Sequence, residues 1–380
     1  PTCPGPRRSL ACFALLVLAG QGESGHLPVW IGQLGAAIAF LLVGAGLHMV
    51  QTVGLALATD LVPDEDQPKV VGLMYVMLLL GMIASAFVFG ALLEDYTPGR
   101  LIQVVQGAAV VTVVLNAVAL WKQEARDRVR GLSTAPKPRF ADAWGSFARG
   151  EGALRLLVVI GLGTAGFGMA DVLLEPYGGQ VLGLSVAQTT KLTAVLAAGG
   201  LIGFTLASVV LKRGASPVTM AAWGATAGVP AFLAIVWAST AHAPALFVAA
   251  TLLAGFGGGL FGHGTLTATM CSAPKEQVGL ALGAWGAVQA TAAGLALAAG
   301  GVIRDLALRL DTGNAALPYA YVFTLEAVLL LFALAALYPL RRKLLDPSHR
   351  GSTLPGQDRT ARQHEPGRDL SVSGTWGPRA

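Results

Sequence analysis

Charged residues are scarce in this chain. Asp, Glu, Lys and Arg make up 12% of its 380 residues, about half the share found in an average soluble protein. Hydrophobic residues make up 54%, and the mean hydropathy is +0.63. This balance excludes an ordinary soluble domain, and we expect no nucleic-acid partner.

Cysteines and catalytic signatures are also few. The three cysteines, Cys3, Cys12 and Cys271, are an odd number without metal-ligand spacing, so neither a disulfide framework nor a zinc site is predicted. No C-x-x-C, H-E-x-x-H, Walker A or G-x-S-x-G pattern is present. We therefore expect no enzyme and no firmly bound cofactor.

Long apolar runs make up most of the chain. A helix of roughly 20 apolar residues crosses the hydrocarbon core of a bilayer, where helices satisfy all backbone polar groups. The run at 9–20 is too short to span and is interpreted as the end of a helix whose start is missing. Full spans are predicted at 29–59, 70–93, 101–121, 154–177, 189–211, 217–238, 244–271, 279–302 and 319–340.

The distribution of basic residues predicts the orientation. Lys and Arg concentrate at one set of helix ends, including seven in the stretch 122–153 and three at 341–343. The opposite ends carry only Arg100, Lys191, Arg304 and Arg309. By the positive-inside rule the first set is cytoplasmic, and the C-terminus with it.

An internal repeat divides the chain. In two places an Ala-Thr pair ends a helix, Pro and Glu follow, and Val-Gly opens the next helix; Thr59 and Thr269 mark the two copies, 210 residues apart. An offset that preserves crossing direction predicts a parallel repeat of six helices, as in major facilitators. The second half would then be complete, whereas about two and a half helices are expected to be missing before the first.

The predicted organisation has four parts. Residues 1–121 form an incomplete N-terminal bundle, from the end of helix 3 through helix 6, and 154–343 form a six-helix bundle. Between them, 122–153 is a cytoplasmic linker in which Phe140, Trp144 and Phe147 fit either a short amphipathic helix on the membrane surface or a solvated loop. The tail 344–380, rich in Pro, Gly, Ser and Arg, is expected to be disordered.

Several strings go beyond the superfamily pattern. GAGLHMVQTVGLALATDLVP (44–63), DVLLEPYGGQ (171–180) and HGTLTATM (263–270) closely resemble the PucC/LhaA family, the bacteriochlorophyll delivery branch of the major facilitators. The resemblance runs from about Ser9 to about Lys343 and implies an all-α, polytopic membrane protein with the major facilitator fold, N-terminally truncated.

The resemblance also implies a function. The expected role is light-harvesting antenna assembly in a bacterial cytoplasmic or intracytoplasmic photosynthetic membrane, with membrane lipid, bacteriochlorophyll as cargo and antenna polypeptides as partners. Physical reasoning alone leaves two other readings open. One is a proton-coupled transporter of a small solute, with Asp171 and Glu175 as proton carriers, and the other is an inert product of a truncated gene.

Two carboxylates at membrane depth are candidate ligand-binding residues. Asp171 and Glu175 are four residues apart and thus share a helix face, toward the outer side. Lys191 begins the next helix on that side, and we expect the three to converge. They form either a structural ion pair or a site for a cation, a proton or a polar ligand group. Tyr177, in the same string, is a further candidate.

Two histidines are the candidate axial ligands to a pigment magnesium, and no direct metal site is predicted. His48, which shares a helix face with Gln51, and His263 lie on repeat-related helices. A neutral imidazole nitrogen can ligate a metal or bond a neighbouring helix. The glycines around His263 leave bare backbone, which suits a flat macrocycle or a closely packed helix equally well.

Two further acids are candidates for gating or structural roles. Asp60 ends its helix on the cytoplasmic side, before the loop at 63–68. Glu326 lies inside the span 319–340 and must face protein or a cavity, because a carboxylate in lipid is costly.

Overall fold

The computed structural model describes residues 67–95, 97–119, 152–273, 278–310 and 313–345, with scattered positions between 34 and 62 and between 144 and 150. Within these ranges the chain is helical and has no strand. Eight stretches are long and apolar enough to span a membrane. They match the predicted spans from 70–93 onward, and the described positions of 29–59 up to residue 58 are helical as well.

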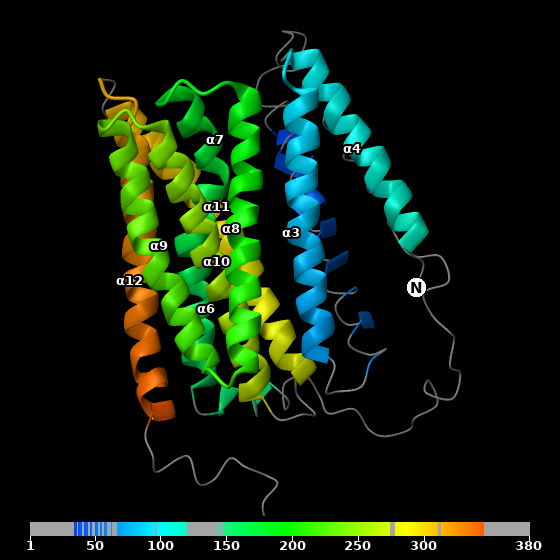
Figure 1. Cartoon of the computed structure of the whole chain (residues 1–380), viewed down its shortest axis with the longest axis vertical. Coiled ribbons are helices and arrows are strands. Elements are labelled where there is room, and N and C mark those ends of the chain that lie inside the picture. The colour runs from blue at the N-terminus through cyan, green and yellow to red at the C-terminus, as the bar shows by residue number, and fades with distance from the viewer. Residues whose placement is uncertain are drawn as a thin grey trace, which may run out of the picture.

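The helices of the second half form one bundle. They are α6 (Ala153–Gly168), α7 (Ala170–Gln180), α8 (Val186–Lys212), α9 (Pro217–Thr240), α10 (Pro244–Ser272), α11 (Val278–Leu310) and α12 (Leu317–Leu345). Helix α10 packs closely against both α8 and α9, while α12 lies against α6 and α9 (Figure 1). The core contains the fully buried rings of Tyr177, Phe232, Phe247, Tyr319 and Phe323.

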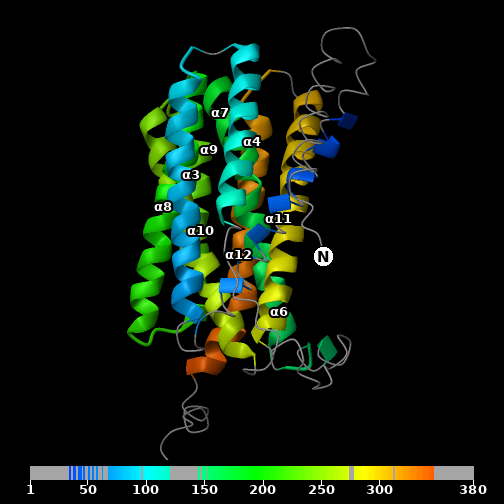
Figure 2. The ribbon, with the colours of Figure 1, turned by 90° about the vertical axis from the view of Figure 1, so that its right-hand side faces the viewer.

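The described part of the first half contributes α3 (Gln67–Leu92) and α4 (Pro98–Ala119). Helix α3 packs on α8, whereas α4 diverges from α3 toward its own C-terminal end (Figure 1), and none of its described side chains is buried. Helices α3 and α11 cross in one direction and α4 and α12 in the other (Figures 1 and 2). These directions agree with a parallel repeat.

One predicted span proves to be two helices. The segment predicted as 154–177 is divided at Met169 into α6 and α7. The backbone N–H of Ala170 donates to Oε1 of Glu326 at 2.7 Å. A side chain that enters the helical ladder in this way bends the helix.

Other predicted features lie largely outside the described residues. These are the segment 9–20, most of the linker 122–153 and the tail beyond 345. In the linker, Trp144, Gly145 and Ala148 are helical, and the half-buried Trp144 packs against the core of the second half.

Glycines allow α8 and α10 to touch through their backbones. A Cβ atom at Gly259 of α10 would overlap the carbonyl oxygen of Gly200 in α8, and one at Gly203 of α8 would overlap the carbonyl oxygen of Phe256 in α10. Gly264 makes the equivalent approach to α9, where its Cβ would lie 2.5 Å from the backbone nitrogen of Ala221. In lipid, such close packing of small residues is a main source of helix association.

These contacts predict a difference between two glycines of α10. We expect Gly259→Ala to lower the free energy of unfolding by about 1–3 kcal/mol, because the methyl group forces α8 and α10 apart. Gly262→Ala meets no atom within 4 Å and should be neutral or slightly stabilising. Thermal unfolding of both variants in detergent measures the difference. Equal midpoints would contradict this account of the α8–α10 contact.

Candidate functional site

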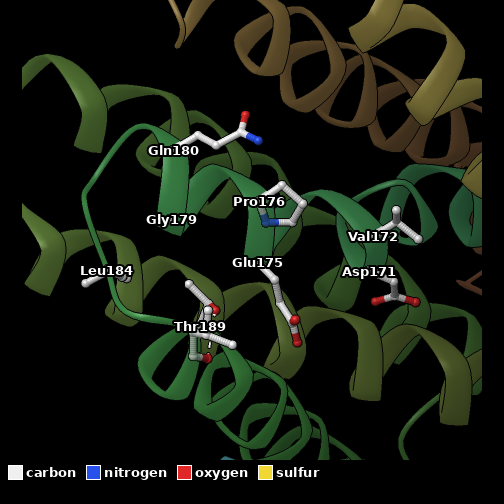
Figure 3. A pocket seen from close by; sticks show the side chains of 9 residues that line it. Asp171, Val172, Glu175, Pro176, Gly179, Gln180, Leu184 and Thr189 are labelled. Carbon is white, nitrogen blue, oxygen red and sulfur yellow. Dashed lines mark hydrogen bonds between the residues drawn. The ribbon is translucent and has the colours of Figure 1, made fainter. Parts of the chain in front are cut away.

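A polar pocket of about 510 Å³ opens beside α7, at its approach to α8 (Figure 3). Asp171 and Glu175 extend from the same side of α7, as their spacing predicts. Asp171 is exposed and Glu175 half-buried. The full lining consists of Asp171, Val172, Glu175, Pro176, Gly179, Gln180, Leu184, Val186 and Thr189.

Glu175 has a hydrogen-bond partner on the facing helix. Oγ1 of Thr193 in α8 donates to its Oε1 at 2.9 Å. Asp171, in the first turn of α7, has no hydrogen bond to another described residue. No basic side chain among the described residues lines this pocket. Two carboxylates in such surroundings favour binding of a proton, a metal cation or a hydrogen-bond donor.

Lys191 does not join these carboxylates. Its side chain runs instead along α3, where a Cβ at Gly90 would lie 3.3 Å from its Cγ. Among the described residues the only ion pair joins Arg304 to Asp305, at 2.8 Å. Asp171 and Glu175 therefore lie together, as predicted, but Lys191 does not join them.

Tyr177 lies behind the pocket and does not line it. The residue is 1% exposed, and its hydroxyl donates to the carbonyl oxygen of Ile235 in α9 at 2.8 Å. Its ring packs against Phe247, Tyr319 and Phe323, with ring centroids 5.2–5.5 Å apart. In this arrangement Tyr177 joins four helices and is not available to a ligand.

Glu326 is fully buried, as expected for a carboxylate inside a span. Its Oε1 accepts the Ala170 N–H, which places it at the N-terminus of α7, one residue before Asp171. Its Oε2 is also buried and has no hydrogen-bond partner among the described residues.

A second polar cluster ties three helices together at the ends that are predicted to face outward, and we call it the outer cluster. Arg304 of α11 donates to Oε1 of Gln180 in α7 at 2.9 Å and to the hydroxyl of Tyr319 in α12 at 3.0 Å. The Tyr319 hydroxyl in turn donates to Gln180 at 2.7 Å. Sequence reasoning used Arg304 only for orientation and missed this cluster, because nothing in the spacing of its residues indicates a contact.

His263 lies inside the bundle, 9% exposed. Its Nε2 is 3.3 Å from Oγ of Ser208, its buried Nδ1 has no hydrogen-bond partner in the described part of the chain, and its ring contacts the Phe204 ring with centroids 4.1 Å apart. Tyr75 of α3 stacks on Phe204 at 5.5 Å and meets Trp285 of α11 edge-on at 6.3 Å. We call Tyr75, Phe204, His263 and Trp285 the aromatic cluster.

Most of the glycine surface around His263 is already occupied. Gly257, Gly259 and Gly264 face the backbones of α8 and α9, whereas Gly262 faces open space. The sequence left open whether a flat macrocycle or a closely packed helix lies on these glycines. In the structure, packed helices occupy most of this surface. Gln51 is helical and half-buried; His48 and Asp60 lie outside the described residues.

An apolar groove of about 540 Å³ follows α3, α8 and α10 along their outer halves. Every side chain that lines it is apolar, and four of them are alanines. They are Ile83, Phe87, Ala194, Val195, Ala198, Ala245, Val248, Ala249 and Leu252.

The arrangement of these helices is that of the major facilitator superfamily. A bacterial homologue of the iron transporter ferroportin, in its inward-facing state, aligns with a TM-score of 0.60 over 87% of this chain and 80% of its own, at 15% identity. The Escherichia coli fucose:proton symporter FucP, a major facilitator transporter, aligns with a TM-score of 0.51 over 87% and 83%, also at 15% identity. At this identity the likeness concerns the fold alone.

The chain belongs to the PUCC protein family, whose pattern matches residues 8–344. It is 64% identical over 296 residues to Protein PucC of Rhodovulum sulfidophilum, covering 77% of this chain and 65% of that protein. It is 60% identical over 338 residues to Protein PucC of Rhodobacter capsulatus, covering 87% and 73%. The bacteriochlorophyll synthase 44.5 kDa chain of Rhodobacter capsulatus is more distant, 27% identical over 316 residues, or 80% and 72%. The chain thus spans about two thirds to three quarters of these relatives.

The outer cluster yields a stability prediction. Arg304→Met removes hydrogen bonds to Gln180, Tyr319 and Asp305, and we expect a loss of about 1–2 kcal/mol of unfolding free energy, since the cluster is partly exposed to solvent. Arg309→Met is the matched control, because Arg309 lies on the same helix, is exposed and has no partner among the described residues. Thermal unfolding in detergent should separate the two variants; equal losses would refute a stabilising role for the cluster.

Proposed function

We propose that this membrane protein acts in the assembly of light-harvesting antenna complexes, by binding or delivering bacteriochlorophyll in the cytoplasmic or intracytoplasmic membrane of a phototrophic bacterium. Membership of the PUCC family carries this proposal. The name of the distant relative, which refers to bacteriochlorophyll synthase, supports it. Solute transport would rest on the fold alone, and nothing in the site favours a catalysed reaction.

The seam between α3 and α8 supports pigment binding by its chemistry. A bacteriochlorophyll combines a flat, aromatic macrocycle with a long apolar tail. Along this seam the apolar groove occupies the outer halves of the helices. The aromatic cluster lies about 12 Å further toward the cytoplasmic side, because Tyr75 precedes Ile83 by eight positions on α3. The apolar groove therefore suits the tail of the pigment, and the aromatic cluster suits its macrocycle.

His263 is the described residue best suited to ligate the pigment magnesium. Its Nδ1 is buried without a partner, and such an atom costs free energy until a partner binds it. The Phe204 ring covers the imidazole in this conformation, so the cluster must open before a macrocycle can approach. The pocket carboxylates of α7 are the alternative ligands.

The groove can be tested by filling it. Ala249 is exposed within the groove, so Ala249→Phe should occupy the space of a tail without disturbing the core. In a phototroph that lacks its own PUCC-family genes, we expect this variant to carry less bacteriochlorophyll after purification in mild detergent and to support less antenna complex. Leu233→Phe, on an exposed face of α9, is the control. Unchanged pigment in Ala249→Phe would exclude the groove as the binding site.

The histidines can be tested by removing the ligand atom. His263→Phe keeps bulk but removes the imidazole nitrogens, and we expect less bound pigment and less antenna with normal membrane insertion. His48→Phe is the parallel variant, expected to have the smaller effect. Pigment content by absorbance, relative to protein, is the measurement. If both variants keep normal pigment, neither histidine is the ligand, and Asp171→Asn and Glu175→Gln become the next variants to measure.

A further inference from the structure

We propose that Glu326 is a proton-binding site at membrane depth, and that release of its proton is linked to movement of α7 relative to α12. No solute transport is implied, and the inference does not depend on the proposed role in antenna assembly. It concerns a buried acid group that pigment binding does not use.

The surroundings of the carboxyl group favour its neutral form. Glu326 is 0% exposed, its Oε1 accepts the N–H of Ala170, the N–H of Met169 also points to the carboxyl group, and its Oε2 has no hydrogen-bond partner among the described residues. An ionised carboxylate needs several donors or a cation to repay the loss of its hydration. Two backbone N–H groups and the N-terminal end of an 11-residue helix offset only part of that cost, whereas a bound proton removes the charge.

Among the described residues, no basic side chain on a neighbouring helix contacts Glu326. Helix α9 carries no ionisable residue. The only one on α6 is Arg155, eleven residues before Gly166 and thus about 16 Å along the helix. The ionisable side chains of the other adjoining helices are Asp171, Glu175 and Tyr177 on α7, Arg304, Asp305 and Arg309 on α11, and Tyr319, Tyr321, Tyr338, Arg341, Arg342 and Lys343 on α12 itself.

Among these groups, Asp171 has the closest connection to Glu326. It directly follows Ala170, whose N–H the Glu326 carboxyl binds, and a second acid nearby disfavours ionisation of both. Asp171 is also exposed in the outer pocket. It therefore offers a route by which a proton reaches Glu326 from the outer side.

The link to movement follows from the contacts of α6 and α7 with α12. Gly166 lies close to α12: a Cβ there would be 2.9 Å from Cδ2 of Leu330 and 3.2 Å from the carbonyl oxygen of Glu326. This close contact leaves no room for water, and an ionised Glu326 carboxylate without water is strongly unfavourable. Loss of the proton therefore requires water or new donors at Oε2. Because the bond from the Ala170 N–H to Oε1 joins α12 directly to α7, we expect these two helices to separate when water enters.

Infrared difference spectroscopy tests the proton directly. In lipid nanodiscs near neutral pH, we expect the full chain to show the carbonyl stretch of a protonated carboxylic acid, and Glu326→Gln to lose the part of this band that belongs to Glu326, while any contribution of Asp171 remains. The amide keeps an oxygen for the Ala170 N–H, so this variant should fold. Glu175→Gln removes a half-buried acid that Thr193 already contacts, and this control should keep the band.

Thiol labelling tests the linked movement. In a background with Cys3, Cys12 and Cys271 replaced by Ser, Val172→Cys places a thiol in the outer pocket. We expect its labelling rate, corrected for thiol ionisation with a model thiol, to rise severalfold as pH increases. With Glu326→Gln added, the corrected rate should not depend on pH.

Three results would overturn the inference. The first is a wild-type spectrum without a protonated carboxyl band, which needs no variant to fold. The second is a band of unchanged intensity in folded Glu326→Gln, and the third is a labelling rate with the same pH dependence in both backgrounds. Loss of pigment binding in Ala249→Phe or His263→Phe would leave all three readouts unchanged, so the two proposals fail separately.

Discussion

A backbone N–H group at membrane depth has no water to bind, and at Ala170 this demand is met by a side chain 156 residues away in sequence. The contact between Glu326 and Ala170 lies where α6 ends and α7 begins. It brings Asp171 and Glu175 to the edge of the outer pocket and fixes α12 against both helices. A donor left unpaired there would cost several kcal/mol in a hydrocarbon environment, so the bend, the pocket and the buried acid form one arrangement.

Close backbone contact provides the second constraint. The glycines of α10 bring α8 and α9 to distances at which no larger residue fits, so α10 is the centre of the second half. The aromatic cluster and the apolar groove both lie where α3 joins this unit, along α8. A ligand at that seam would contact both halves at once, as expected for a site that responds to their relative movement.

The sequence was sufficient for the spans and their directions, since lipid imposes a minimum length on every apolar run and the repeat fixes polarity. It was also sufficient to place Asp171 and Glu175 on one face, because helical spacing is local. It could not reveal the bend at Met169, which depends on a carboxylate from a distant helix, or the partners of Arg304. The glycines around His263 fitted two interpretations, and only the positions of α8 and α9 decided between them. Tyr177 has the residue type of a ligand-binding group, but the rings around it come from segments far away in sequence.

Helix α7 is attached to the same part of the bundle at both of its ends. Its first residue bonds Glu326 of α12, and its last, Gln180, bonds Arg304 of α11 and Tyr319 of α12. From the first attachment to the last the helix has only 11 residues, about 15 Å of rise, and the pocket opens along that length. The Tyr177 hydroxyl also holds the helix to α9 between these two attachments. When one end is released, the other end and Tyr177 remain as the points about which α7 can turn. The outer pocket therefore has two alternative hinges, one buried and acidic and one exposed and basic, and the attachment that yields first determines which end of the pocket widens.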